Sequence, residues 1–182
     1  SPSTTPDKST IFDLLMISLP ASVPRVNRFL QGLCYNGENL LIGRGWGVAP
    51  GYIFVYGTLM TGFENHRRYL AGHVLRVDKA AVRGELFHLK HGFPALVTGT
   101  DKVAGELLLV KDLPALLPLL DELEDYYGPG QDNMYERVEM EAATGSGRAV
   151  KALTYRYARL WELAGLGVKV EGGNWREYLR MS

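Results

Sequence analysis

The sequence predicts an α+β domain in which several short strands form a closed or nearly closed sheet. From about residue 52 onward, short apolar runs alternate with turn-forming residues, which is typical of β-strands. Only a few segments have helical spacing, and strands do not alternate regularly with helices as they do in parallel sheets. A chain of 182 residues is long enough for one such domain with an appendage.

Five apolar runs bounded by turn-forming or charged residues are the expected strands. They cover 53–56, 82–89, 103–111, 135–141 and 149–157. The last two flank the sequence Thr-Gly-Ser-Gly, which is typical of a hairpin turn.

One clear helix is expected between the third and fourth strands. Asp112 is suited to cap its N-terminus, and Pro114 is tolerated in its first turn. Leucines at helical spacing follow and give the helix one apolar face, whereas Pro118 is expected to split or kink it. A last short helix is expected to begin near Asn174 and to carry Trp175.

The first fifty residues are expected to form a separate part, followed by the main domain at 51–182. A polar tail at 1–9 precedes two short helical segments at 10–19 and 22–33. The second segment has an apolar face, so we expect this helical extension to pack on the main domain or on a second copy in a homodimer. The glycine-rich segment 43–51 lacks the ending of a phosphate-binding loop and is interpreted as a connector.

Charge and cysteine content narrow the classes of partner. Lysine plus arginine and aspartate plus glutamate number 20 each, so the chain lacks the positive surplus typical of proteins that bind nucleic acid. The apolar stretch 11–19 is too short to span a bilayer, so no membrane partner is expected. The single cysteine, Cys34, fits a reducing compartment, and a cytoplasmic location is expected.

The first candidate site is the segment Tyr56, Gly57, Thr58 and Leu59, which follows the first expected strand. Glycine lets the backbone turn sharply and lets a ligand approach it closely. Successive amide groups beyond a strand end bind a carboxylate or a developing oxyanion. The same pattern also occurs in ordinary tight turns, and the segment by itself leaves both interpretations open.

The second candidate is Glu124, near the end of the expected helix among four carboxylates. Such a cluster is usually a solvated helix end. Glu124, however, lies four residues after Leu120, on the apolar face of the helix. Burial, neighbouring negative charge and the helix dipole would each raise the pKa of its carboxyl, which favours proton transfer near neutral pH. His88 and His91 have a metal-like spacing but no second pair of ligands, so no metal site is expected.

Taken together, these segments resemble the γ-glutamylcyclotransferase-like family, over about residues 52–178. The resemblance depends on an ordered set of short motifs: Tyr-Gly-Thr-Leu at 56–59, Gly-Glu-Leu-Phe at 84–87, Phe-Pro-Ala-Leu at 93–96, Gly-Glu-Leu at 105–107, Leu-Asp at 120–121 with Glu124, Tyr-Glu-Arg at 135–137, Tyr155, and Gly-Asn-Trp at 173–175. Gly62 and Asn65 are most similar to the branch that acts on γ-glutamylamines. No counterpart is identified for residues 1–50.

The resemblance implies a small mixed β-barrel with flanking helices and an enzyme that forms 5-oxoproline. Such an enzyme, of the amidine-lyase or acyl-transfer type, catalyses attack of the substrate's own α-amine on its γ-carbonyl and releases an amine. It needs neither a metal nor an organic cofactor. The implied roles are general acid and base for Glu124, and γ-glutamyl binding for the 56–59 loop.

Two further residues are expected to bind the substrate. Tyr135, with Tyr56, would wall the pocket and donate hydrogen bonds. Arg137 would either pair with a substrate carboxylate or form a structural ion pair.

Two alternatives to an enzyme are a non-catalytic binding module that keeps the same pocket and a protein-interaction domain that uses the N-terminal helices.

Overall fold

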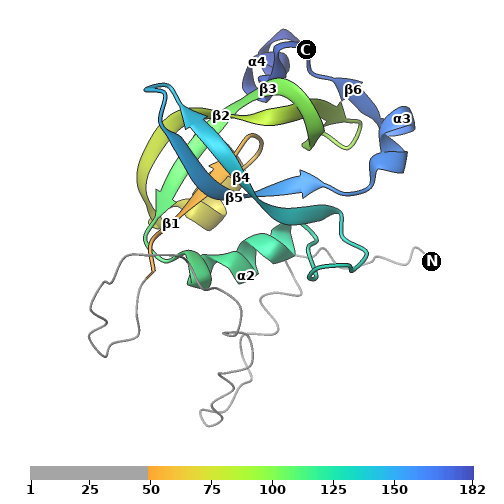
Figure 1. Ribbon diagram of the computed structural model, residues 1–182. Helices are drawn as coiled ribbons and strands as arrows, with labels where there is room; N and C mark the ends of the chain where they lie inside the picture. Colours follow the sequence, from red (N-terminus) through yellow and green to blue (C-terminus); the bar gives the residue numbers. More distant parts are fainter. Residues whose placement is uncertain (1–48) are drawn as a thin grey trace, which may run out of the picture. The chain divides into compact units, whose positions relative to one another are not determined.

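The expected apolar runs form the strands of a closed barrel in the computed structural model, which describes residues 49–182 (Figure 1). The barrel strands are β1 (Gly51–Val55), β2 (Val74–Leu89), β3 (Pro94–Val110), β4 (Tyr135–Thr144) and β5 (Ala149–Tyr157). They are joined in the order β3–β1–β5–β4–β2, and β2 also pairs with β3, which closes the ring. β1 and β5 are parallel and the other neighbours antiparallel, so the expected small mixed barrel is confirmed.

Two barrel strands extend much further toward their N-terminal ends than the sequence indicated. β2 begins at Val74 and β3 at Pro94, well before the expected starts. The additional part of β2 is mostly exposed, with charged residues such as Arg76 and Asp78, so it lacks an apolar run. The pairing of β2 with β3 shifts register between Arg83 and Glu85, and such a shift bends a long hairpin into a barrel wall.

The two helices that were expected within the described residues are present. In α2 (Leu113–Leu123), an Asp112 carboxylate oxygen accepts a hydrogen bond from the Ala115 amide at 3.2 Å. Of the split or kink expected at Pro118, the split is wrong, because α2 continues through this residue. Pro118 removes a single intrahelical hydrogen bond, whereas buried Leu116 and Leu120 hold both halves of the helix against the barrel core. In α4 (Trp175–Met181), Asn174 caps the N-terminus by accepting from the Glu177 amide.

Several short elements were not expected from the sequence. They are a π-helical turn η1 (His66–Leu70), the 3-10 turns η2 (Leu160–Glu162) and η3 (Glu171–Gly173), α3 (Leu163–Leu166) and β6 (Gly167–Lys169), which pairs with β2 outside the ring.

Among the described residues, no helix has the length and apolar character needed to cross a membrane. The helical segments expected at 10–33, their packing and Cys34 lie outside the described residues.

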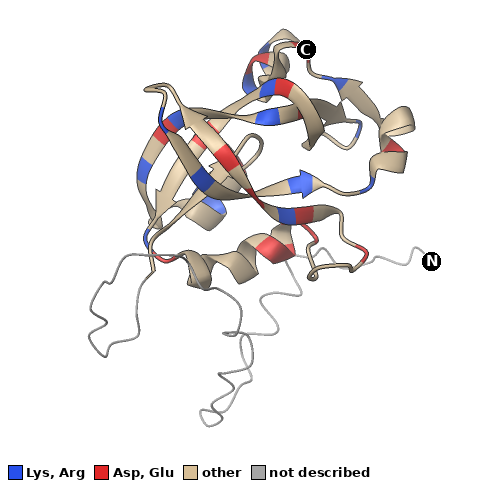
Figure 2. Cartoon of the chain, viewed as in Figure 1, with Lys and Arg blue, Asp and Glu red and all other residues tan. Residues whose placement is uncertain are grey.

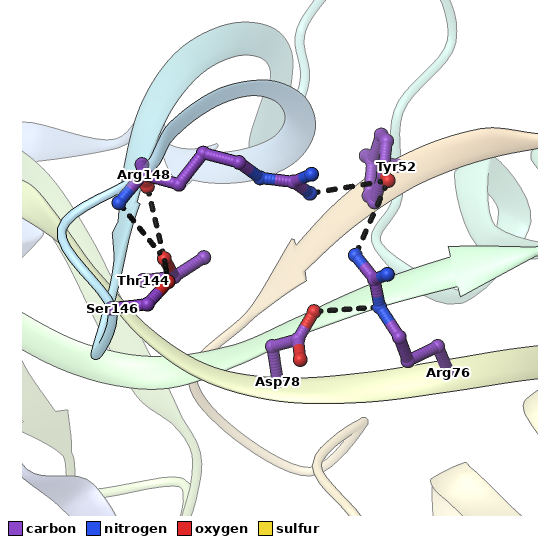
Figure 3. Close-up of polar contacts among 6 residues, drawn as sticks. All are labelled: Tyr52, Arg76, Asp78, Thr144, Ser146 and Arg148. Atoms are coloured by element: carbon purple, nitrogen blue, oxygen red, sulfur yellow. Dashed lines mark hydrogen bonds and ion pairs between the residues drawn. The ribbon is translucent and has the colours of Figure 1, made fainter.

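A polar cluster connects β1, β2 and the β4–β5 turn near the start of β1 (Figure 3). The Tyr52 hydroxyl accepts hydrogen bonds from Arg76 of β2 at 3.4 Å and from Arg148 of the β4–β5 hairpin at 3.3 Å. Arg76 also pairs with Asp78 at 2.8 Å. Such exposed contacts add little free energy, so the buried core provides most of the stability of this barrel end.

Candidate active site

A cavity of about 300 Å³ lies where the loop after β1 meets the C-terminal end of α2. Its lining includes all the site residues expected from the sequence except Arg137: Tyr56, Gly57, Thr58, Leu59, Glu124 and Tyr135. The structure therefore brings the two candidate segments to one space, although 64 residues of chain or more separate them in sequence. The acidic residues at this end of α2 are visible in Figure 2.

The strand directions explain why these segments meet. β1 and β5 run parallel, with Ile53 opposite Leu153, so both strands lead toward the same end of the barrel. β4 runs antiparallel to β5, with Tyr135 opposite Tyr157, so β4 begins at that end. The loop at 56–59, the second half of β5 and the start of β4 thus surround one opening, which α2 borders.

Glu124 is positioned by the way α2 ends. It is the C-cap residue, and Asp125 after it adopts a left-handed backbone conformation, with φ of +48°. The Tyr126 amide donates to the Asp121 carbonyl at 2.9 Å and the Asp125 amide to the Glu122 carbonyl at 3.4 Å. This pair of hydrogen bonds is the Schellman pattern of helix termination, which holds the backbone of Glu124 in place.

The environment of Glu124 favours its protonated form. The pKa of the Glu124 carboxyl is raised to about 8. Burial is the larger cause, and the neighbouring negative charge of Asp125 is the smaller one. The direction and both causes agree with the expectation from the sequence. A carboxyl with a pKa near 8 accepts and returns protons efficiently at neutral pH.

This pKa makes the stability of the protein depend on pH. Between pH 4.5 and about 8 the folded protein keeps the Glu124 proton, whereas the unfolded chain releases it. The free energy of unfolding is therefore expected to fall as pH rises through this window, by up to about 1.4 kcal/mol per pH unit from this group, and to level off above it. Urea denaturation of wild type and Glu124→Gln from pH 5 to 9 measures the difference. Parallel profiles for the two proteins would contradict the assignment, and the exposed Glu122, changed to Gln, is the control.

The loop at 56–59 is tightly packed and presents amide groups. A Cβ atom on Gly57 would lie 2.4 Å from Cγ of Pro94, so only glycine fits there without displacing the proline. The Met60 amide donates to the Gly57 carbonyl at 2.9 Å, which closes the turn. Among the described residues, the amides of Gly57, Thr58 and Leu59 donate to no protein acceptor. These amides therefore remain able to bind a ligand.

Contacts from α4 and β3 hold the chain just after this loop. One Glu106 carboxylate oxygen accepts from the Thr61 amide at 2.7 Å, and the other accepts from Arg176 at 3.0 Å. Arg176 also donates to the Thr61 carbonyl at 2.8 Å. Within the loop, the Asn65 side chain donates to the Thr58 hydroxyl at 2.9 Å.

The tyrosines wall the cavity, but their hydroxyl protons go to protein atoms. Tyr56 donates to the Tyr155 carbonyl and Tyr135 to the Pro94 carbonyl, each at 2.7 Å. Burial raises the pKa of both phenols well above the usual value, so both stay neutral. The expected wall is present, whereas the hydrogen bonds expected toward a ligand go to the barrel backbone in this structure.

Arg137 forms the structural ion pair that was one of its two expected roles. Its guanidinium is 2.5 Å from an Asp121 carboxylate oxygen and packs over the Tyr126 ring. The other Asp121 oxygen accepts from the Tyr155 hydroxyl at 2.6 Å. Arg137 thus lies behind the cavity wall and supports Tyr155.

Some lining residues were not singled out from the sequence, and Thr154 is the most notable. It is a polar residue at an inward position of β5, two residues after buried Ala152. The only sequence signal for this inward position was the alternation of side chains along the expected strand, which puts Thr154 on the same face as Ala152. Asp125, Met134 and Leu153 also line the cavity.

The histidines that had a metal-like spacing have other contacts. His88 accepts a hydrogen bond from the Trp175 indole at 3.0 Å, and the His91 ring stacks on Phe93. In the described part of the chain, no group of three or more metal-ligating side chains is present.

The Glu124 carboxyl and the amides of the 56–59 loop thus meet at one small cavity of a closed barrel, an arrangement suited to acid–base chemistry on a small molecule. Comparison with known proteins identifies the class more closely. The family described as gamma-glutamyl cyclotransferase, AIG2-like, matches residues 53–177, and the chain belongs to this family.

Individual relatives agree with this assignment. Gamma-L-glutamyl-butirosin B gamma-glutamyl cyclotransferase of Niallia circulans is 37% identical over 108 residues, which are 59% of this chain and 67% of that protein. The crystal structure of YkqA from Bacillus subtilis matches 73% of this chain with a TM-score of 0.53 and 21% identity, but this chain spans only 42% of YkqA. A gamma-glutamyl cyclotransferase structure matches 73% of this chain and 86% of its own, with a TM-score of 0.53 and 16% identity. The two structures support the fold.

Proposed function

We propose that this protein converts a γ-glutamyl amide into 5-oxoproline and a free amine. The observation that carries the proposal is the cavity that Glu124, with a pKa near 8, shares with the free amides of the 56–59 loop. Membership of the gamma-glutamyl cyclotransferase, AIG2-like family supports this reaction class.

The proposed reaction is intramolecular. The ionised Glu124 carboxylate takes a proton from the substrate α-ammonium, because only the neutral amine attacks. The amine nitrogen then bonds to the γ-carbonyl carbon and closes a five-membered ring. The negative charge on the γ-oxygen is stabilised by loop amides, and Glu124 returns the first proton to the departing nitrogen as the γ-carbonyl re-forms and the amide bond breaks. The Glu124 carboxylate then takes the second proton from the positively charged ring nitrogen and passes it to the released amine, which leaves as an ammonium ion. A cavity that holds the curled substrate conformation supplies much of the acceleration.

The leaving amine is proposed to be that of a γ-glutamylamine. Gly62 and Asn65 follow the loop as in the branch that acts on such compounds, and Asn65 contacts Thr58 and lines the cavity. The relative from Niallia circulans is named for γ-L-glutamyl-butirosin B, which supports a γ-glutamyl compound as the substrate.

A mass-spectrometric screen for 5-oxoproline tests the proposal. The purified protein is incubated with γ-glutamyl amides of small amines, lysine, polyamines and aminoglycosides, with Glu124→Gln as the control. Release of 5-oxoproline by wild type alone is the expected result. Binding of these amides without turnover would contradict the enzyme and favour the binding module.

A further inference from the structure

The chain that leaves the 56–59 loop is held by an ion pair from outside the cavity. A Glu106 carboxylate oxygen accepts a hydrogen bond from the Thr61 amide at 2.7 Å, and Arg176 donates one to the Thr61 carbonyl at 2.8 Å. Arg176 also donates to the other Glu106 oxygen at 3.0 Å. Both polar backbone groups of Thr61 are therefore bound by one pair of charged side chains, neither of which lines the cavity.

This ion pair lies where β1 passes into the loop. Glu106 of β3 is opposite Val55, the last residue of β1, and its side chain is only 15% exposed. The guanidinium carbon of Arg176, from α4, packs 5.1 Å from the centre of the Phe63 ring. Because the pair is partly buried, solvent screens it less than it screens an exposed pair.

The loop depends on such anchors because it has no regular structure of its own. Residues 56–63 form neither a strand nor a helix, so no ladder of backbone hydrogen bonds fixes them. Gly57 packs closely on Pro94 and fixes one end of the loop. The ion pair fixes the other end at Thr61, just after the free amides of residues 57–59. The direction in which these amides point therefore depends on both anchors.

We propose that Glu106 and Arg176 are positioning residues, which act through Thr61 to orient the loop amides toward the γ-oxygen of the substrate. This inference rests on the proposed function, in which these amides stabilise the negative charge that develops on the γ-oxygen. A hydrogen bond that strengthens as this charge develops contributes to kcat rather than to KM. A small change in the direction of the amides therefore lowers kcat more than it weakens substrate binding.

The kinetic test compares Glu106→Gln with Glu85→Gln. Glu106→Gln keeps the shape of the side chain but replaces one accepting oxygen by an amide nitrogen, so either the Thr61 amide or Arg176 loses its acceptor. It is expected to lower kcat about 10- to 100-fold with KM changed less than threefold. Glu85 belongs to the other Gly-Glu-Leu motif, pairs with Lys169 at 3.6 Å and does not line the cavity, so Glu85→Gln should keep wild-type kinetics.

Two results would overturn the inference. One is a Glu106→Gln protein that melts at a lower temperature but keeps the wild-type kcat, because the ion pair would then be purely structural. The other is a rise in KM with kcat unchanged, because the loop amides would then act on bound substrate and transition state alike.

Arg176→Met tests whether the two side chains act as one unit. Alone, it is expected to lower kcat to a similar extent, because Thr61 again loses part of its anchor. In the double variant with Glu106→Gln, the two losses should not multiply. Losses that multiply would show two independent effects and contradict a joint action through Thr61.

Hydrogen–deuterium exchange followed by NMR separates failure of this inference from failure of the proposed function, since it needs no substrate. The Met60 and Thr61 amides donate hydrogen bonds in the folded loop and should exchange about fivefold faster in Glu106→Gln and Arg176→Met. In Glu85→Gln they should exchange as in wild type. Unchanged exchange in the first two variants would overturn the inference, whether or not wild type forms 5-oxoproline. Faster exchange together with an inactive wild type would support the anchoring of the loop and contradict the proposed function.

Discussion

Glu124→Gln is expected to lower the rate of 5-oxoproline release by about a thousandfold while the protein stays folded. Glutamine has nearly the same shape but neither accepts nor returns a proton at neutral pH, and general acid–base catalysis contributes about 10²- to 10⁴-fold. Wild-type kcat/KM should also rise with pH until about pH 8, where the free Glu124 carboxyl is ionised. Steady-state assays of 5-oxoproline release from pH 6 to 9 measure both effects.

Glu122→Gln is the matched control, because Glu122 belongs to the same acidic helix end but is exposed and does not line the cavity. This variant should retain wild-type rates. Activity of Glu124→Gln within tenfold of wild type, in a protein with an unchanged circular dichroism spectrum, would remove Glu124 from the proposed mechanism.

Gly57→Ala is expected to reduce kcat/KM about a hundredfold. The added methyl group would meet the Pro94 ring at 2.4 Å, and a proline ring has little freedom to move aside. Either the loop or the start of β3 must shift, and both line the cavity. Displacing reacting groups by about 1 Å costs on the order of 10²-fold. Kinetic assays together with the melting temperature measure the effect.

Gly145→Ala supplies the comparison for this variant. Gly145 lies in the β4–β5 turn, has no atom within 4 Å of an added Cβ, and does not adopt a left-handed conformation. Its replacement should leave kinetics and melting temperature near wild type. If Gly57→Ala behaved in the same way, close packing of the loop on Pro94 would not be required for activity.

The parts of the site that depend on local sequence could be predicted, whereas those that depend on tertiary contacts could not. The inward placement of Glu124 follows from helical spacing relative to Leu120 within one element. The hydroxyl partners of Tyr56 and Tyr135 are backbone carbonyls from distant strands, about which local sequence carries no information. For the same reason, local sequence did not distinguish the two expected roles of Arg137. Its partner Asp121 reaches it only when α2 packs beside β4.

For the fold, too, features that are local in the sequence could be predicted, and features that depend on tertiary contacts could not. The hairpin of β4 and β5 and the Asp112 cap at the N-terminus of α2 are local features, and the structure confirms them. The first parts of β2 and β3 were missed because each is held as a strand by pairing with the last part of the other strand, and local sequence does not show this pairing. Pro118 does not end α2 as its position in the sequence indicated. Leu116 and Leu120 pack into the core on both sides of it, and a sequence does not show this packing.

The tyrosine hydroxyls that bind the barrel backbone have a consequence for how new substrate preferences arise. Because Tyr56 and Tyr135 cross-link strands as well as bordering the cavity, altering either would disturb the scaffold and the pocket together. Variation is therefore less costly at the rim, where side chains such as Phe93 and Met134 are only partly buried. For the proposed reaction, substrate preference should therefore diverge in the choice of departing amine, while recognition of the part that would become the lactam stays the same.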